Sequence, residues 1–201
     1  MTRLDRSEGA VFVYSVVLFL HIVGALALFA GVGLEQAALA NVRRASSVAQ
    51  LREWVRLLGA NRFVEGPGAF TILATGIYMA MTRWGHHAWI ALGLLGLVLM
   101  GILGAAVSRR RVDAIRKELP AADGPVSGAL RRRLHDPMLR ASATIRAAIG
   151  VGVVFIMTVK PGTAGASTAL GVALALGVVV AMAGWGEGRR GSAAGERATQ
   201  S

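Results

Sequence analysis

The sequence predicts an all-α protein, a polytopic transmembrane helical bundle of five spans, from three observations. Of the 201 residues, 54% are hydrophobic and 16% are charged, whereas about 25% of the residues of a soluble domain are charged. Five apolar runs approach or exceed the ~18 to 20 residues that cross a bilayer, the fourth of them interrupted by Arg146. The basic residues gather between these runs. Together these features exclude a soluble globular enzyme.

The expected spans cover residues 11–34, 64–82, 89–107, 141–159 and 168–185. At 1.5 Å per residue each reaches roughly 28 Å, about the thickness of the hydrocarbon layer. Short connections join the second span to the third and the fourth to the fifth, so these neighbours are expected to be antiparallel. We predict a single domain over residues 1–186, with the first four spans as its core and the fifth packed alongside.

Charge predicts the orientation. The formal net charge is +11, yet 17 of the 22 Lys and Arg residues fall in the 35–63 and 108–140 segments and the tail after Gly186, and only four fall on the other side. The positive-inside rule then places the N-terminus outside and the C-terminus inside. Since the charge is confined to segments between apolar runs, we expect the lipid bilayer as partner and no nucleic acid.

Two inner segments have a pattern of their own. Leu51, Trp54, Val55 and Leu58 lie on one face of a helix over about 46–60, which predicts either an amphipathic helix at the inner interface or a solvated extension of the first span. Residues 187–201 are rich in Gly, Ser, Ala and Arg and predict a disordered cytoplasmic tail.

Small residues recur every fourth position in the last two spans, as in Ala169, Ala173 and Gly177, or Ala148 and Gly152. Such seams allow helices in lipid to pack closely. They fit contacts within one chain as well as a homo-oligomer or another membrane partner. The chain has no cysteine, which excludes disulfides, thiolate metal sites and Cys nucleophiles.

Polar residues inside spans are costly and are therefore the functional candidates. His21 lies ten residues into the first span, roughly 15 Å deep by helical rise. Such a histidine can hydrogen-bond a neighbouring helix, relay protons, or ligate a metal or haem iron. Gly24 and Ala25 lie one turn away on the same face, where they leave room for a flat macrocycle or for close helix packing.

A six-coordinate haem needs a second ligand at similar depth. Met100 lies about eleven residues into the third span, and His/Met ligation is a known cytochrome pattern, although Met is also a common filler of apolar packing. His86 and His87 lie in an outer hairpin and His135 on the inside. None of these three matches the depth of His21.

Arg146 and two glutamates form the remaining candidates. Arg146 lies about five residues from the inner end of its span, and Glu35 and Glu65 lie at the inner ends of the first two spans. Arg146 can snorkel to the inner head groups, pair with either glutamate, or pair with a haem propionate. No phosphate-binding loop, nucleotide-binding glycine motif, His-Glu-x-x-His or serine elbow is present, so no enzymatic activity is assigned.

Three segments together resemble a known family: residues 20–25 (Leu-His-Ile-Val-Gly-Ala), 84–89 (Trp-Gly-His-His-Ala-Trp) and 157–162 (Met-Thr-Val-Lys-Pro-Gly). In order and spacing they resemble a bacterial family of uncharacterised integral membrane proteins. More remotely, over about residues 10–165, the chain is similar to the copper-resistance protein D group and to HemJ-type membrane protoporphyrinogen oxidases. The resemblance implies the bacterial cytoplasmic membrane, haem b within a four-helix bundle, and His21 at a ligand position.

Two departures limit what the resemblance implies. The oxidases carry a Lys near the start of the third helix and an Asn-Glu-x-Pro segment early in the fourth, whereas the positions after Trp89 are apolar here and residues 143–147 read Ala-Thr-Ile-Arg-Ala. Oxidase activity is therefore not carried over, and no Met/His cluster suits copper. Two hypotheses remain: a haem-b-binding or redox-associated module with His21 as axial ligand, and a cofactor-free scaffold, lipid-binding protein or small-solute transporter.

Overall fold

The computed structural model describes the backbone of residues 3–198 and the side chains of residues 8–128 and 130–183. This part of the chain is helical and contains no strand, which confirms the all-α prediction. The elements in chain order are α1 (Arg3–Arg44), α2 (Val48–Ala60), α3 (Arg62–Met79), the π-helical turn η1 (Ala80–Trp84), α4 (Ala88–Leu103), the π-helical turn η2 (Gly104–Arg109), α5 (Arg110–Glu118), α6 (Gly128–Leu134), α7 (Pro137–Val159) and α8 (Thr163–Ala198).

Four helical segments of the described chain are long and apolar enough to cross a membrane: Glu8–Arg44, Ala88–Glu118, Leu130–Val159 and Thr163–Ala183. They contain the predicted first, third and fourth spans and most of the fifth. The predicted second span, 64–82, forms α3 and η1 but is not among the four. Arg62, Glu65 and Pro67 lie in the first two turns of α3.

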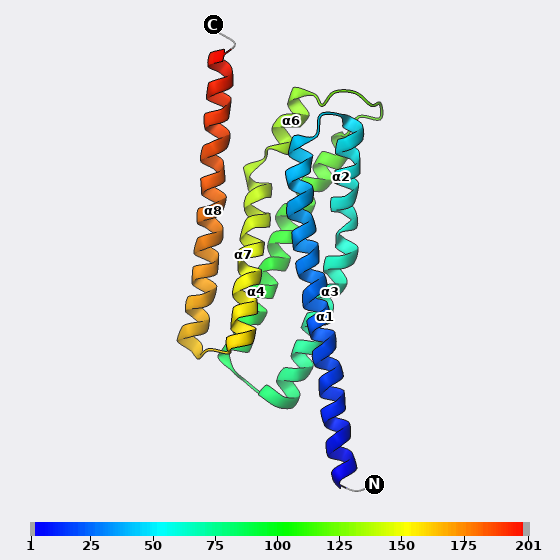
Figure 1. The fold of residues 1–201 in the computed structure, drawn as a ribbon, viewed down its shortest axis with the longest axis vertical. Helices are drawn as coiled ribbons and strands as arrows, with labels where there is room; N and C mark the ends of the chain where they lie inside the picture. The colour runs from blue at the N-terminus through cyan, green and yellow to red at the C-terminus, as the bar shows by residue number, and fades with distance from the viewer. Residues whose placement is uncertain (1–2, 199–201) are drawn as a thin grey trace.

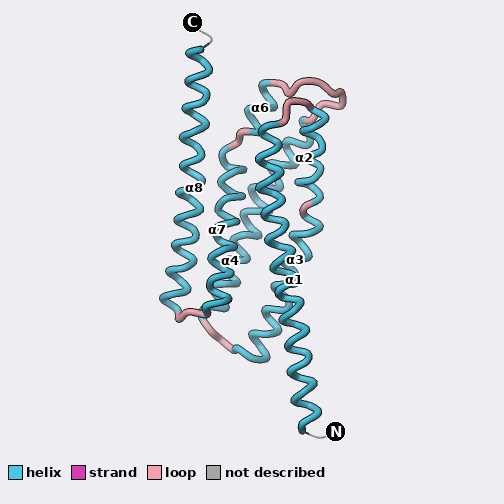
Figure 2. Tube along the Cα trace, in the orientation of Figure 1, coloured by secondary structure: helices cyan, strands magenta, loops and turns pink. Residues whose placement is uncertain are grey.

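The helices form an antiparallel bundle with the chain ends at opposite poles (Figures 1 and 2). We call the pole with α2 and α6 the cap end, and the pole with the turns at 85–87 and 160–162 the hairpin end. α3 packs along α1, while α7 packs against both α4 and α8. A smaller contact between α1 and α7 joins these two groups. The two packed groups are thus joined by the contact of α1 with α7 and, at the cap end, by that of α2 with α5.

Small residues set the closest helix contacts. A Cβ atom added at Gly68 of α3 would lie 3.0 Å from the carbonyl oxygen of Gly24 on α1, so a larger residue would push the two backbones apart. Between α7 and α8, a Cβ at Gly152 would lie 2.7 Å from the Cβ of Ala173. The small-residue seams of the last two spans therefore face each other within one chain.

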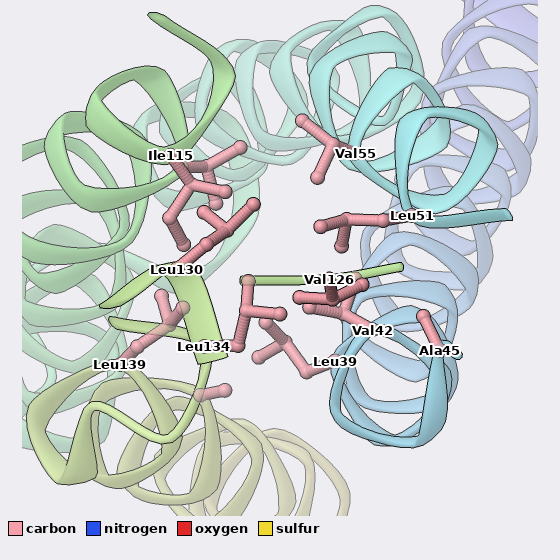
Figure 3. Packing of buried hydrophobic residues seen from close by; sticks show 12 residues of the cluster. Leu39, Val42, Ala45, Leu51, Val55, Ile115, Val126, Leu130, Leu134 and Leu139 are labelled. Carbon is pink, nitrogen blue, oxygen red and sulfur yellow. The ribbon is translucent and has the colours of Figure 1, made fainter. Parts of the chain in front are cut away.

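A hydrophobic cluster closes the cap end (Figure 3). α1 is 42 residues long, about 63 Å by helical rise and twice the hydrocarbon thickness, so it continues well beyond a membrane. Its last turns pack with α2, α5, α6 and the start of α7. This cap cluster consists of Leu39, Val42, Ala45, Leu51, Val55, Val112, Ile115, Val126, Leu130, Leu134, Leu139 and Ala143.

The helix expected over 46–60 forms as α2, but its apolar face differs from the expectation of an interfacial helix. Leu51 and Val55 are buried inside the cap cluster, so they face protein and not lipid. On the opposite face, Arg52 donates to Asp123 Oδ1 and to the Pro120 carbonyl, both at 3.0 Å. The apolar face of α2 forms as predicted. It packs against α5 and α6, which the pattern of α2 alone does not reveal.

Local signals fix where several helices begin and end. Ser47 and Ser127 each accept a hydrogen bond from a backbone N–H of the first turn, as N-caps of α2 and α6, and Asp136 does the same for α7 just before Pro137. α7 ends at Lys160, whose φ of 50° lies in the left-handed region. The prediction of a disordered tail over 187–201 stays a prediction, since α8 is drawn to Ala198 and residues 199–201 lie outside the described residues.

We expect Gly68→Ala to destabilise the bundle, because its Cβ would press on the backbone of α1. Overpacking of this kind costs about 1–3 kcal/mol. Gly66→Ala is the matched control, since a Cβ there meets nothing within 4 Å and both changes raise helix propensity equally. Thermal unfolding in mild detergent, followed by circular dichroism, measures the difference. Equal melting temperatures for the two variants would contradict the close packing of α3 against α1 at Gly68.

Candidate functional site

Arg146 of α7 bonds to two glutamates inside the bundle. Its Nη1 donates to Oε2 of Glu35 on α1, and its Nη2 donates to Oε1 of Glu65 on α3. The side chains of Arg146, Glu35 and Glu65 are 5%, 6% and 14% exposed. The structure thus selects pairing over snorkelling, and with both glutamates at once. We call these three residues the charged triad.

Two glycines make room for the triad. A Cβ at Gly104, the first residue of η2, would lie 3.1 Å from Arg146 Cζ, and a Cβ at Gly31 on α1 would lie 2.5 Å from Glu65 Cγ. A larger residue at Gly104 or at Gly31 would force the side chain of Arg146 or of Glu65 to shift. π-Helical turns such as η2 occur frequently at functional sites, and here the turn passes its backbone directly over the guanidinium.

Polar groups surround the triad. Asn61, at the junction of α2 and α3, donates from Nδ2 to the Gly31 carbonyl at 2.9 Å. Ser142 of α7 donates to the Leu103 carbonyl at 3.1 Å, and its hydroxyl lies 3.2 Å from that of Ser108. At this site two buried atoms have no protein partner, Arg146 Nε and Asn61 Oδ1. The site is therefore polar but not fully satisfied by the chain itself.

The triad holds two carboxyl groups against one guanidinium. With both carboxyl groups ionised, one net negative charge remains among side chains that are almost fully buried. Unbalanced charge is expensive in a low-dielectric interior, so the site favours a proton or the positively charged group of a ligand. In the described part of the chain, no three or more His, Cys, Asp or Glu residues gather to hold a metal ion.

A cavity of about 140 Å³ adjoins the triad. It lies between α3, which packs on α1, and α4, which packs on α7 and α8. Its lining includes the exposed residues Gly101 and Ala105 of α4 and η2, so it opens to the outside of the bundle between the two helices. The lining changes along its length from apolar, through the triad, to basic: Leu28, Ala69, Leu97 and Met100, then Glu35, Glu65, Asn61, Ser108 and Arg146, then Arg62, Arg109, Arg116 and Asp113.

His21 does not join this site. Its Nδ1 lies 2.9 Å from Thr75 Oγ1, and the Thr75 hydroxyl itself donates to the Thr71 carbonyl. The Thr75 oxygen is therefore an acceptor for an Nδ1–H, which leaves Nε2 as the ring's free lone pair. His21 is half-buried on the α1–α3 seam.

The space expected for a macrocycle beside His21 is filled. A Cβ at Gly24 would lie 3.1 Å from both the Gly68 carbonyl and the Thr71 side chain, so α3 occupies this face of α1. Met100 is buried beside Gly150, which also contacts Phe29. Phe29 lies eight residues from His21 along α1, about 12 Å by helical rise. The α1–α3 seam as packed does not fit a haem, and His21 and Met100 contact different parts of the bundle.

At the hairpin end, the residues of two sequence motifs come together. The Lys160 ammonium lies 4.3 Å from the centre of the Trp84 ring, and Trp84 and Trp89 meet edge to face at 5.5 Å. Trp84 Nε1 donates to the Tyr14 hydroxyl at 3.2 Å. Since Trp and Tyr favour membrane interfaces, this cluster fits an anchor. The neighbouring loop residues His86 and His87 are exposed.

No family model, curated protein or solved structure matches this chain. The resemblances drawn from the three sequence segments therefore stay predictions.

Sequence reasoning identified each member of the triad but missed the residues that complete the site. Asn61 stands between two helices, and Ser108 sits in a basic segment expected to be a loop. Gly31 and Gly104 are two among 26 glycines. Only the crossing of α1, α3 and η2 at one point distinguishes these four residues, and no spacing in the sequence signals it.

We expect Arg146→Leu to lower the free energy of unfolding by about 3–5 kcal/mol, because it leaves two carboxylates buried without a cation. The triple variant Arg146→Leu/Glu35→Gln/Glu65→Gln removes the charges together and should recover much of this loss. Arg133→Gln is the control, since its pair with Glu118 is exposed and worth at most about 1 kcal/mol. Thermal unfolding in detergent measures all three; an Arg146→Leu protein as stable as the control would refute the role of the triad.

Proposed function

We propose that this protein is a five-span integral membrane protein of the cytoplasmic membrane that binds a lipid or lipid-like amphiphile at the charged triad. The observation that carries the proposal is the cavity between α3 and α4. It is open toward the surroundings of the bundle, apolar at one end and polar and charged at the other. This combination of linings suits a molecule with a hydrocarbon chain and a polar head.

The proposed topology counts α3 as a fifth span. α3 returns the chain from the cap end to the hairpin end, where α4 begins, and the chain ends lie at opposite poles (Figure 1). An odd number of crossings accounts for both features. The cap end carries most of the basic residues, which favours a cytoplasmic cap and an external N-terminus.

In this arrangement the ligand reaches the site from the bilayer. Its chain lies between α3 and α4 against Leu97 and Met100, and its head lies beside Arg146. The cavity is near the cap end: Arg146 is seven residues along α7 from Leu139 of the cap cluster, about 10 Å by helical rise. The inner leaflet would therefore supply the ligand.

We expect Leu97→Trp to fill the apolar end of the cavity and to reduce co-purified lipid severalfold, because the larger ring takes the place of the chain. Leu94→Trp is the matched control, three residues away on α4, exposed and outside the cavity lining. Native mass spectrometry of protein purified in mild detergent measures bound lipid. Equal lipid occupancy in both variants, or no lipid on the wild type, would reject the proposal.

Haem b on His21 is the second candidate, and one contact favours it. Ligand histidines commonly donate their second ring N–H to an oxygen, as the Nδ1 of His21 can to Thr75. Such a haem requires α3 to move away from Gly24.

The reduced-minus-oxidised absorption spectrum of protein purified from haem-replete cells tests this candidate. Haem ligation predicts a near-stoichiometric haem-b band that is lost in His21→Ala and kept in His86→Ala, whose loop position is exposed. Lipid binding without haem predicts a colourless protein, with His21→Ala affecting stability alone.

A further inference from the structure

The charge lining the cavity changes sign along its length. At the buried end, two carboxyl groups, those of Glu35 and Glu65, face the single guanidinium of Arg146. At the basic end, toward the cap end of the bundle, the exposed residues Arg62, Arg109 and Arg116 outnumber Asp113; we call this end the mouth. A ligand that complements both ends carries a positive group and a negative group in its polar head.

At the buried end, Asn61 Oδ1 has no hydrogen-bond donor and Arg146 Nε has no acceptor. Asn61 is 5% exposed and lines the cavity, and its Oδ1 has no partner. A Cβ added at Gly31 would lie 3.2 Å from Asn61 Oδ1 and 2.5 Å from Glu65 Cγ, so this oxygen lies beside Gly31 and Glu65. The amide oxygen and the carboxylates accept hydrogen bonds and donate none. A positive group with N–H donors satisfies the unpaired oxygen and the excess charge together.

The mouth suits a phosphate. Three arginines offer the planar donor groups that recognise phosphate oxygens. Arg62 precedes Glu65 by three residues on α3, so the two side chains lie on one face about 5 Å apart along the helix. An ethanolamine linker between a phosphate and an ammonium spans about this one helical turn.

We infer that the ligand is a phospholipid whose head group carries a phosphate and a primary ammonium, as in phosphatidylethanolamine. The inference rests on the proposed function. The phosphate binds the arginines of the mouth. From there the ethanolamine arm enters the triad, where the ammonium binds Glu65, Glu35 and Asn61 Oδ1, and the acyl chains leave from the phosphate toward the bilayer between α3 and α4. A choline head group has no N–H to donate, and a glycerol head group brings no positive charge to the triad.

Native mass spectrometry with competing lipids tests the assignment. The full chain, delipidated in mild detergent, is incubated with equal amounts of phosphatidylethanolamine, phosphatidylcholine and phosphatidylglycerol with identical acyl chains. We expect about tenfold or greater preference for phosphatidylethanolamine, the ratio that charged hydrogen bonds typically supply.

Two variants and one control separate the two ends of the head group. Glu65→Gln keeps an oxygen for Arg146 Nη2 and leaves a one-to-one pair of Arg146 and Glu35, so the fold is retained while the preference for the primary amine falls toward equality. Arg62→Gln/Arg109→Gln weakens all three phospholipids alike. Arg110→Gln, exposed and outside the cavity, leaves both affinity and preference unchanged.

The outcomes distinguish the inference from the function beneath it. Binding of no lipid rejects the proposed function and the inference together. Equal binding of the three lipids, or stronger binding of phosphatidylglycerol, rejects the primary-amine assignment and leaves lipid binding intact. A preference that survives in Glu65→Gln places the selective contact elsewhere and overturns the assigned site.

Discussion

The bond between Arg146 and its two glutamates is the constraint on which the bundle depends. The two helix groups, α1 with α3 and α4 with α7 and α8, meet within the bundle where α1 contacts α7. Arg146 bonds across this contact to one residue on α1 and one on α3. Within an environment of low dielectric these bonds are strong and directional. The triad therefore fixes how the two groups sit against each other.

The cap explains how the bundle can hold a cavity without losing cohesion. In lipid, apolar contacts between helices gain little from the hydrophobic effect, because the lipid chains are equally apolar. The cap cluster buries its apolar side chains against one another at one pole, and the part of this burial that removes surface from water gains the hydrophobic effect. It holds α1, α2, α5, α6 and α7 together at one pole, so α3 and α4 can remain apart beside the triad.

The site combines features that stability alone would not select. A pair of one arginine and one glutamate would balance its charge, yet a second carboxylate is added and an amide oxygen is left unpaired. Unsatisfied buried polar groups cost free energy and are rare in native proteins. Their presence next to an open cavity is the physical reason to assign binding to this place.

The sequence by itself determined the all-α class, the apolar helices and the polar candidates. Helical periodicity also identified the apolar face of Leu51 and Val55, although not its partner. These features follow from the local order of apolar and charged residues, which is fully present in one dimension. Hydropathy also predicted a span over 64–82, the segment in which Gly68 contacts α1 and Glu65 contacts Arg146.

The tertiary structure alone decided which polar groups meet. Glu35, Glu65 and Arg146 are far apart in the chain, and their convergence depends on which faces of α1, α3 and α7 turn toward one another. From the sequence, the face of α1 at Gly24 suits either another helix or a macrocycle. In the structure α3 packs against this face. Gly31 and Gly104 matter only because of the side chains that lie over them. A pattern along one helix fixes its own faces, but the identity of the facing residue is set by the crossing of helices, which only the folded bundle specifies.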